Sequence, residues 1–489
     1  MVVDAWLERA ARSAPVAIAV ETTLGACSYA QLLELARGGA GELAARGAAR
    51  GERVAIALPA GLDFVCALHA CLLLGAVAVP VDLRLGERER AAIVDGAEVV
   101  VDEPLRVSGA RGAVVGVRGA LAGARGIPAG AVHDLDAVAA VIHTSGTTSA
   151  PKPVELTYGN FLWSALGSAV ALGLDPHERW LCNLPLSHVG GLSILLRSAI
   201  YGTTAVVHER FDTELALRAV MGEAGSDVHL FEPPTKRAAA AAARAARGDV
   251  SSVTPVTLVS LVATTLARLL DAGLECPPTL RCALTGGGPV PAALLERSRA
   301  AGVPVSLTYG MTEACSQVTT LPLAAVKNGS TAPAAAGPPL FCTRVRTAAD
   351  GEIEVAGPTL ARGVAGEDGW LRTGDMGRLN GEGNLLVTGR KADTIVSGGE
   401  NVAPTEVEAV LEEHPCVLEA AAIGRPDERW GEAVTALVVV RDGVKLRGEE
   451  LRTHCAERLA PYKVPKDVAL VEGPLPRTRS GKLLRRELS

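Results

Sequence analysis

The sequence is poor in aromatic residues, which make up only 3% of its 489 residues. Proteins that stack single-stranded nucleic acid depend on such side chains. The formal net charge of −6 also gives no overall attraction to nucleic acid or to anionic lipid. We therefore expect no nucleic-acid partner.

Paired cysteines are missing as well. The ten cysteines are scattered without a C-x-x-C pair, which favours reduced thiols in a cytoplasmic protein over disulfides or a zinc site. The start, MVVDAWLERAARSAP, lacks the pattern of a signal peptide. The longest apolar stretch, FVCALHACLLLGAVAVPV, is interrupted by His69, Gly75 and Pro80, so it predicts a buried helix and a strand rather than a membrane span.

The length exceeds what one hydrophobic core supports, so we expect at least two domains. Strand-like runs such as ERVAIAL, AAVIH, RCALTGG and VPVSLTYG alternate with helical patterns such as YAQLLELARGGAGELAARG. This alternation predicts α/β layers with parallel sheets, whose ligands bind at the carboxyl ends of the strands. After residue 390, the helix EVEAVLEEHP, the strand EAVTALVVV and the proline-stopped helix EELRTHCAERLAPYKVP predict a compact α+β unit. The predicted domains are residues 1–390 and 391–489.

One segment, PPTKRAAAAAARAARGD, predicts an alanine-rich basic helix. A solvated surface excursion is the simpler interpretation, and a basic contact surface for a partner is the alternative.

A turn rich in hydroxyl groups, HTSGTTSAPKP, follows the apolar run AVAAVI. Backbone N–H groups in a glycine-bearing turn form an anion-binding concavity, to which the hydroxyls add donors and Lys152 a positive charge. The pattern predicts a polyphosphate site. It is not a Walker A motif, because prolines occupy positions 151 and 153, where that motif has Gly and Ser or Thr. A Ser/Thr-rich surface turn is the alternative.

The stretch LTYGMTEAC predicts a strand that ends at Tyr309, a turn at Gly310, and then Thr312 and Glu313. An aromatic face can stack on a purine, and a carboxylate near phosphate oxygens can hold Mg²⁺. A packed strand end is the alternative for Tyr309.

Three further motifs carry polar residues. WLRTGDMG predicts a glycine-flanked turn in which the Asp375 carboxylate can accept hydrogen bonds from a ribose. TGRKADTIVSGGENV supplies Arg390 and the pair Gly398 and Gly399, where a ligand could approach closely. PRTRSGKLLRREL carries Lys482 on a Ser-Gly turn. A simple turn former and a solvated basic tail are the alternatives for the aspartate and the lysine.

Together and in this order, TSGTT…K, YGMTE, TGD, GRKADTIVSGGENV and RSGKLLRREL resemble the adenylate-forming superfamily of acyl-CoA synthetases, peptide-synthetase adenylation domains and luciferases. The resemblance covers nearly the whole chain. Within the superfamily, LPLSHVGGLSILLRSAIYG and LTGGGPVPAALLE resemble the o-succinylbenzoate–CoA ligase family of menaquinone biosynthesis. The resemblance implies a large N-terminal domain of layered α/β subdomains plus a small β-barrel, with a mobile small α+β C-terminal domain.

The resemblance also implies roles for single residues. The residues implied to bind ATP are Thr144, Ser145, Gly146, Thr147, Thr148, Lys152, Gly287, Tyr309, Gly310, Thr312, Asp375 and Arg390. The acyl pocket is implied to contain His188, Arg197, Gly286, Gly287, Gly288 and Ser316. Glu313 is implied to bind Mg²⁺, and Gly398 and Gly399 to approach CoA. The implied catalytic residues are Lys482, Thr312 and His188.

In this family the acid first becomes an acyl-adenylate and then a CoA thioester. Lys482 is implied to bridge the substrate carboxylate and the α-phosphate, where two anions must meet. The small domain then rotates about a hinge near Arg390, which withdraws Lys482 and brings the SGGEN loop toward the thiol.

Arg197 stands alone in the apolar run GGLSILLRSAIYG. A cation there needs either an anion, such as the ring carboxylate of o-succinylbenzoate, or a route to the surface. Three departures from the family pattern stand out. Ser149 and Pro153 replace glycines of the phosphate loop, and Ala392 replaces a common hinge acid. Residues 225–254 look like an insertion near the acyl pocket, between a helix and the predicted strand TLVSLVATTLARLLD.

We therefore expect a cytoplasmic ATP-dependent o-succinylbenzoate–CoA ligase that uses ATP, Mg²⁺ and CoA. Its expected partners are small molecules, and a homodimer is left open. The alternatives are a CoA ligase for another aryl or acyl acid, an inactive relative acting as a binding protein, and an adenylating domain that loads a carrier protein. The presence of Lys482, Glu313 and Asp375 speaks against inactivity.

Overall fold

The computed structural model describes residues 1–105, 130–144, 152–222, 255–327, 335–441, 443–444, 446–477 and 483–488. The alanine-rich segment at 225–254 therefore lies outside the described residues. Among the residues that are described, no helix is both long enough and apolar enough to cross a bilayer.

A five-stranded sheet has the order β6-β4-β5-β8-β9. Its strands are β6 (Val99–Val101), β4 (Arg53–Ile56), β5 (Val77–Pro80), β8 (Val138–Thr144) and β9 (Lys152–Thr157). The first four run parallel, and β9 pairs antiparallel with β8. The helices α3 (Leu62–Leu74) and α4 (Glu87–Val94) connect its strands. The interrupted apolar stretch thus forms a buried helix followed by a strand, as predicted.

The second sheet has eight strands in the order β15-β14-β13-β12-β10-β11-β2-β3. The strands are β15 (Ser316–Thr320), β14 (Val305–Met311), β13 (Cys282–Thr285), β12 (Leu258–Leu261), β10 (Arg179–Cys182), β11 (Thr204–Val207), β2 (Ile18–Thr22) and β3 (Gly25–Ser28). Its inner strands run parallel, while the two edge strands β15 and β3 run antiparallel.

Helices cover and separate these two sheets. They are α1 (Trp6–Ser13), α2 (Tyr29–Ala45), α5 (Tyr158–Leu172), α6 (Val189–Tyr201), α7 (Thr213–Met221), α9 (Ala263–Asp271), α10 (Ala292–Ala300) and α11 (Leu323–Lys327). One apolar core includes side chains of both sheets and of α2, α3, α5 and α6, so these helices fill the layer between the sheets. The predicted α/β layering with parallel sheets is confirmed.

Two smaller sheets follow along the chain. The strands β16 (Arg344–Thr347), β17 (Glu352–Ala356), β18 (Leu371–Leu379) and β19 (Leu385–Arg390) form an antiparallel sheet in sequential order. Within the described residues its edge strands β16 and β19 do not pair with each other, so the predicted small barrel is an open sheet.

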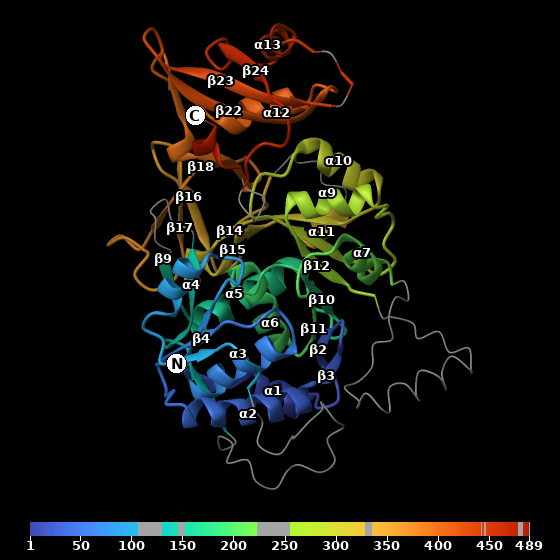
Figure 1. Ribbon diagram of the computed structural model, residues 1–489, viewed down its shortest axis with the longest axis vertical. Helices are drawn as coiled ribbons and strands as arrows, with labels where there is room; N and C mark the ends of the chain where they lie inside the picture. The colour runs from blue at the N-terminus through green and yellow to red at the C-terminus, as the bar shows by residue number, and fades with distance from the viewer. Residues whose placement is uncertain are drawn as a thin grey trace, which may run out of the picture.

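The chain leaves this sheet at Arg390 and, after the 3₁₀ turn η2 (Lys391–Asp393), enters the last sheet. Its strands are β20 (Ile395–Ser397), β21 (Glu400–Val402), β22 (Val417–Asp427), β23 (Gly431–Val440) and β24 (Asp467–Leu470), with α12 (Pro404–Glu412), α13 (Gly448–Ala456) and η3 (Arg485–Glu487). This unit has its own apolar core. In Figure 1 it lies, in orange and red, at the opposite end of the molecule from the blue helices α1 and α2.

Two sequence predictions for helices and strands were wrong in detail. Helix α13 ends at Ala456, well before Pro461, so the proline does not stop it. The run TLVSLVATTLARLLD was predicted as a strand, but it divides into the short strand β12 and the helix α9. A buried strand of four residues and one turn of a buried helix are built from the same types of apolar residue, so a short apolar run does not distinguish them.

The N-terminal segment is fixed by an aromatic cluster. Strand β1 (Val2–Asp4) pairs with β7 (Val132–Asp134), and the His133 Nε2 accepts a hydrogen bond of 3.3 Å from the backbone N–H of Trp6. The His133 ring stacks on Tyr158 at 4.3 Å and meets the Trp6 ring edge-on at 4.8 Å. Burial lowers the pKa of His133 to about 3 and that of His69, which is also buried, to about 4.

We expect the chain to lose stability in mild acid because of this cluster. A histidine whose folded-state pKa is depressed contributes stability above its unfolded pKa of about 6.5 and loses it as the pH falls toward the folded value. For His133 the loss between pH 7 and pH 5 is about 2 kcal/mol. Urea unfolding at both pH values should show a smaller loss in His133→Gln than in the wild-type chain, while His177→Gln, at an exposed site, should match the wild type. An equal loss in all three proteins would contradict this account.

Candidate active site

Asp375 joins two strands and a tyrosine of another sheet. It lies opposite Arg390 in the β18–β19 pair, and its Oδ1 is 2.7 Å from the Arg390 Nε. The Tyr309 hydroxyl, from the end of β14, donates a hydrogen bond of 2.8 Å to its Oδ2. The residue is buried, so a cation and a donor fix a carboxylate that has little contact with water. The predicted turn at Asp375 is wrong, because the residue lies within β18.

The strand that carries Tyr309 continues through Gly310 to Met311, so the predicted turn at Gly310 is also wrong. A side chain at Gly310 would lie 1.7 Å from the Ser316 carbonyl oxygen, which explains the glycine by close backbone approach. Thr312 and Glu313 follow in the 3₁₀ turn η1 (Thr312–Ala314). They therefore lie directly after the strand end that presents Tyr309.

The two ends of the hydroxyl-rich turn lie side by side. Thr144 ends β8 and Lys152 begins β9, and the two residues face each other across the antiparallel pair. The Thr144 hydroxyl donates a hydrogen bond of 3.3 Å to the Lys152 carbonyl oxygen. Ser145, Gly146, Thr147 and Thr148 lie outside the described residues.

Residues assigned to the acyl pocket come from two strand ends of the eight-stranded sheet. His188 precedes helix α6 after β10, and its side chain is 46% exposed. Gly286, Gly287 and Gly288 follow β13. Both groups lie at the carboxyl ends of parallel strands, the edge where such sheets bind ligands.

Arg197 is buried, which excludes the surface interpretation. Its Nη2 donates a hydrogen bond of 2.9 Å to the Ser164 hydroxyl, and the guanidinium lies 5.6 Å from the centre of the Trp180 ring. Burial lowers its pKa, and its Nε has no hydrogen-bond partner among the described residues. No carboxylate of those residues forms an ion pair with it.

The arginine is connected to the predicted substrate residue Ser316. Ser164 donates a hydrogen bond of 2.7 Å to the Cys315 carbonyl, so it links Arg197 to the backbone that precedes Ser316. Cys315 and Ser316 have φ angles of 52° and 90°, a left-handed conformation that costs energy for residues with a side chain. Such strain is concentrated at functional sites.

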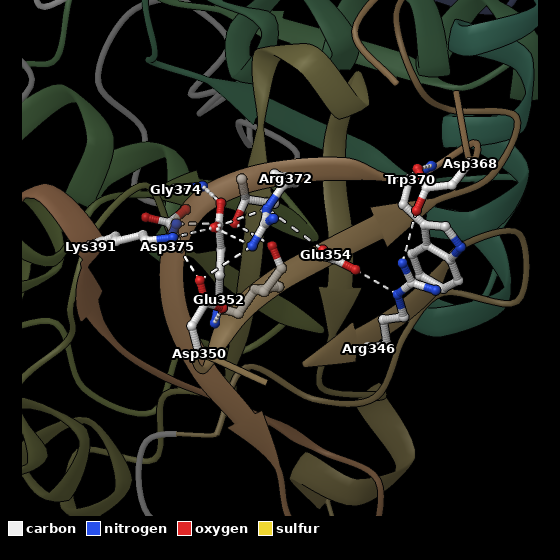
Figure 2. A network of polar contacts seen from close by, with 12 residues as sticks. Arg346, Asp350, Glu352, Glu354, Asp368, Trp370, Arg372, Gly374, Asp375 and Lys391 are labelled. Atoms are coloured by element: carbon white, nitrogen blue, oxygen red, sulfur yellow. Dashed lines mark hydrogen bonds and ion pairs between the residues drawn. The ribbon is translucent and has the colours of Figure 1, made fainter. Parts of the chain in front are cut away.

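Glu352 connects the site to the start of the C-terminal unit (Figure 2). Its buried carboxylate accepts hydrogen bonds of 2.9 Å from the Gly374 N–H, next to Asp375, and of 2.9 Å from the Lys391 ammonium. Lys391 also lies 2.7 Å from Asp350. Burial opposes ionisation, but Lys391, Gly374 and Arg372 together lower the pKa of Glu352. The carboxylate therefore stays charged and links the strand of Asp375 to the residue after Arg390.

Arg485 connects the C-terminal residues to helix α12 and to the turn η2. Arg485 makes hydrogen bonds of 2.8 and 2.7 Å to the Glu408 carboxylate of α12 and one of 3.1 Å to Asp393 of η2. Lys482 lies outside the described residues.

The predicted CoA residues lie on a separate sheet. Gly398 and Gly399 form the β20–β21 turn with φ angles of 62° and 85°. A side chain at Gly398 would meet the Trp430 ring at 3.0 Å, so the turn depends on glycine there.

Sequence reasoning missed several polar residues around these sites. Arg84 and Asp82 follow β5, and the Arg84 guanidinium contacts His188 at 3.2 Å. Their position after a parallel strand could have drawn attention to them, whereas nothing in the sequence indicates that Ser164 contacts Arg197. Glu352 was missed because a single glutamate in a strand carries no motif.

The chemistry of these residues fits a nucleotide with its magnesium ion. The described residues contain no cluster of three or more His, Cys, Asp or Glu side chains able to hold a metal by themselves. Mg²⁺ in nucleotide sites is commonly bound through one or two carboxylates plus phosphate oxygens and water. Glu313, in the turn η1 after β14, supplies one such carboxylate.

Comparison with known proteins decides the family. The family model for AMP-binding enzymes matches residues 7–365, and the model for the C-terminal domain of AMP-binding enzymes matches residues 406–482. The chain belongs to the AMP-binding enzyme family. This AMP-binding enzyme is 36% identical to the 2-succinylbenzoate–CoA ligase of Bacillus licheniformis, over 99% of its own length and 98% of that protein. The ligase of Bacillus subtilis is also 36% identical, with 99% and 97% covered.

Solved structures agree with this assignment. The o-succinylbenzoate CoA synthetase of Bacillus subtilis in complex with the acyl-adenylate intermediate has a TM-score of 0.80 at 34% identity, covering 100% of this chain and 98% of that one. The same protein with ATP and magnesium ion also has a TM-score of 0.80, with 100% of both chains covered. MatB from Rhodopseudomonas palustris bound to ATP has a TM-score of 0.80 at 26% identity, covering 99% and 98%.

We expect Asp375→Asn to weaken AMP binding by about tenfold or more, because an amide cannot accept from Arg390 and a ribose as a carboxylate does. Calorimetric titration with AMP measures this. Asp368→Asn is the matched control, since Asp368 pairs with Arg346 on the exposed part of the same sheet. Equal affinity in the wild-type chain and both variants would remove Asp375 from the nucleotide site.

Proposed function

We propose that this AMP-binding enzyme is an ATP-dependent o-succinylbenzoate–CoA ligase of menaquinone biosynthesis. The observation that carries the choice of acid is Arg197, a buried guanidinium without a carboxylate partner among the described residues. o-Succinylbenzoate has two carboxylates, and only the succinyl carboxylate is activated. The ring carboxylate remains charged and needs a cation, directly or through water.

In the first half-reaction, a succinyl carboxylate oxygen attacks the α-phosphorus of ATP and pyrophosphate leaves. We propose that Asp375 and Arg390 bind the ribose. Tyr309 stacks beside the adenine, and Thr312 contacts a phosphate. Residues from Thr144 to Lys152 would surround the phosphates. Mg²⁺, held through Glu313, would neutralise phosphate charge. The role of Lys482 is to offset the repulsion between the carboxylate and the phosphate.

The acyl group would lie between the residues after β10 and those after β13. This places His188 and the glycines Gly286, Gly287 and Gly288 along the acid in our assignment. Ser316, which follows the Cys315 carbonyl that Ser164 links to Arg197, would face the ring carboxylate.

In the second half-reaction, the CoA thiol attacks the acyl carbon and AMP leaves. We assign residues 1–390 to the stationary domain and 391–489 to the mobile one. The change of sheet after Arg390 supports this boundary. The bond between Arg485 and Asp393 supports movement of the C-terminal segment together with the turn after Arg390. Rotation would bring Gly398 and Gly399 toward the thiol. We also propose a homodimer and a cytoplasmic location, and the ten free cysteines support the latter because thiols stay reduced there.

A panel of acids tests the proposal. Pyrophosphate release and CoA-thioester formation are measured with o-succinylbenzoate, benzoate, succinate and medium-chain acids. We expect thioester from o-succinylbenzoate with a kcat/KM about a hundredfold above that of the others, because a polar pocket strongly rejects acids that leave its charge unpaired.

Each other outcome selects an alternative. A strong preference for another acid would identify a CoA ligase of different specificity. Pyrophosphate release without thioester would favour loading of a carrier protein. If no acid led to pyrophosphate release, the result would contradict the ligase proposal and favour a binding protein.

A further inference from the structure

Arg84 contacts His188 from a neighbouring sheet. It follows strand β5, and its Nη2 lies 3.2 Å from the His188 Nε2. Asp82 also accepts from this guanidinium, with hydrogen bonds of 2.8 Å from Nε and 2.6 Å from Nη2, and a third of 3.0 Å from the Arg84 backbone N–H. A two-point Arg–carboxylate pair has a fixed geometry, so Arg84 is held in place against the imidazole.

This contact determines where the proton of His188 lies. An arginine side chain only donates hydrogen bonds and stays charged at any physiological pH. The His188 Nε2 must therefore accept from Arg84 and carry no proton, which leaves the proton of the neutral ring on Nδ1. The same contact excludes the doubly protonated, charged imidazole.

The net effect of the surroundings also favours the neutral imidazole. Burial lowers the pKa of His188, the Arg84 charge lowers it further, and Asp82 opposes both effects. These two residues supply the charges that act on His188 within the described part of the chain. The nearest Asp82 oxygen lies 3.8 Å from the His188 Nε2. If Arg84 were absent, a protonated His188 could therefore pair with Asp82 instead.

We propose that Arg84 is a positioning residue, which holds His188 neutral with its proton on Nδ1 and prevents it from pairing with Asp82. The consequence for catalysis rests on the proposed function, in which His188 lies along the bound acid. A neutral imidazole at that place offers an N–H donor without adding a charge. A protonated His188 paired with Asp82 would instead be drawn toward β5 and away from the acid.

The proton state is tested without any activity measurement. Proteins labelled at the histidine rings are titrated by NMR, and the His188 signal is assigned by its loss in His188→Gln. We expect Arg84→Gln to shift the His188 midpoint to higher pH. The double variant Asp82→Asn/Arg84→Gln should reverse much of this shift, because the alternative partner is removed as well.

The matched control is Arg88→Gln, since Arg88 is exposed on the adjacent helix α4. Its midpoint should equal that of the wild-type chain. A midpoint in Arg84→Gln that stays at the wild-type value or moves to lower pH would overturn the proposal. Thermal melting of each variant identifies any protein that is not folded, and Arg84→Lys then provides a second variant that keeps a charge but loses the two-point pairing.

The catalytic consequence has a separate readout. With o-succinylbenzoate, the acid limb of thioester formation should move to higher pH in Arg84→Gln, so that the ratio of the rates at pH 6 and pH 8 falls below that of the wild type and of Arg88→Gln. An unchanged pH profile together with a shifted NMR midpoint would show that His188 is positioned by Arg84 but that its charge does not matter for the reaction. Absence of thioester from the wild-type chain would refute the proposed function alone and leave the NMR result intact.

Discussion

A charge that leaves water must meet an opposite charge or a ligand, and this constraint governs the interior of the chain. Arg179 of β10 pairs with Glu21 of β2 at 2.8 Å, across the intervening strand β11 of the eight-stranded sheet. Glu178 is paired with Arg281. Asp375 is compensated by Arg390 and by the Tyr309 hydroxyl. Arg197 differs from these residues, because the described part of the chain offers it a hydroxyl and an aromatic face but no carboxylate.

The compensated charges also connect the sheets. Asp375 joins the end of β14 to the β18–β19 pair, and Glu352 joins the same pair to Lys391, directly after Arg390. Asp350 and Glu352 together raise the pKa of Lys391, so this connection persists at neutral pH. Through Glu352, the strand that carries Asp375 is therefore linked directly to the segment where the chain passes into its C-terminal sheet. This connection supports the proposed rotation of the C-terminal unit between the two half-reactions.

Much of this arrangement could be predicted from the sequence. The alternation of apolar runs and amphipathic helices predicted the layers. The glycine- and hydroxyl-rich ends of the runs predicted that the candidate residues lie after the carboxyl ends of parallel strands, as His188 and Gly286 do. Local conformation was predicted less well. Gly310 and the glycines around Asp375 indicated turns, but all of them lie in strands. At Gly310 and Gly377 a neighbouring backbone comes too close for a larger residue, whereas Gly374 has a φ of 71°. A glycine that permits close approach and a glycine that permits a turn look the same in one sequence.

Contacts between distant segments could not be predicted at all. Ser164 and Arg197 come from different helices, and Arg84 and His188 follow strands of different sheets, so no local pattern pairs them. Arg197 itself could be singled out, since an arginine in an apolar run requires an explanation. Only the structure shows that Arg197 is buried and has no counter-ion among the described residues. These two facts indicate that a ligand supplies the negative charge.

The most direct measurement compares two acids in two proteins. o-Succinylbenzoate and 3-benzoylpropionate, which lacks only the ring carboxylate, are tested with the wild-type chain and with Arg197→Gln. If Arg197 binds the ring carboxylate, the wild type should prefer o-succinylbenzoate in kcat/KM by about ten- to a hundredfold, the usual effect of a charged hydrogen bond, and Arg197→Gln should lose that preference while its KM for ATP stays unchanged. An equal loss for both acids would contradict the account, because it would make Arg197 a structural residue.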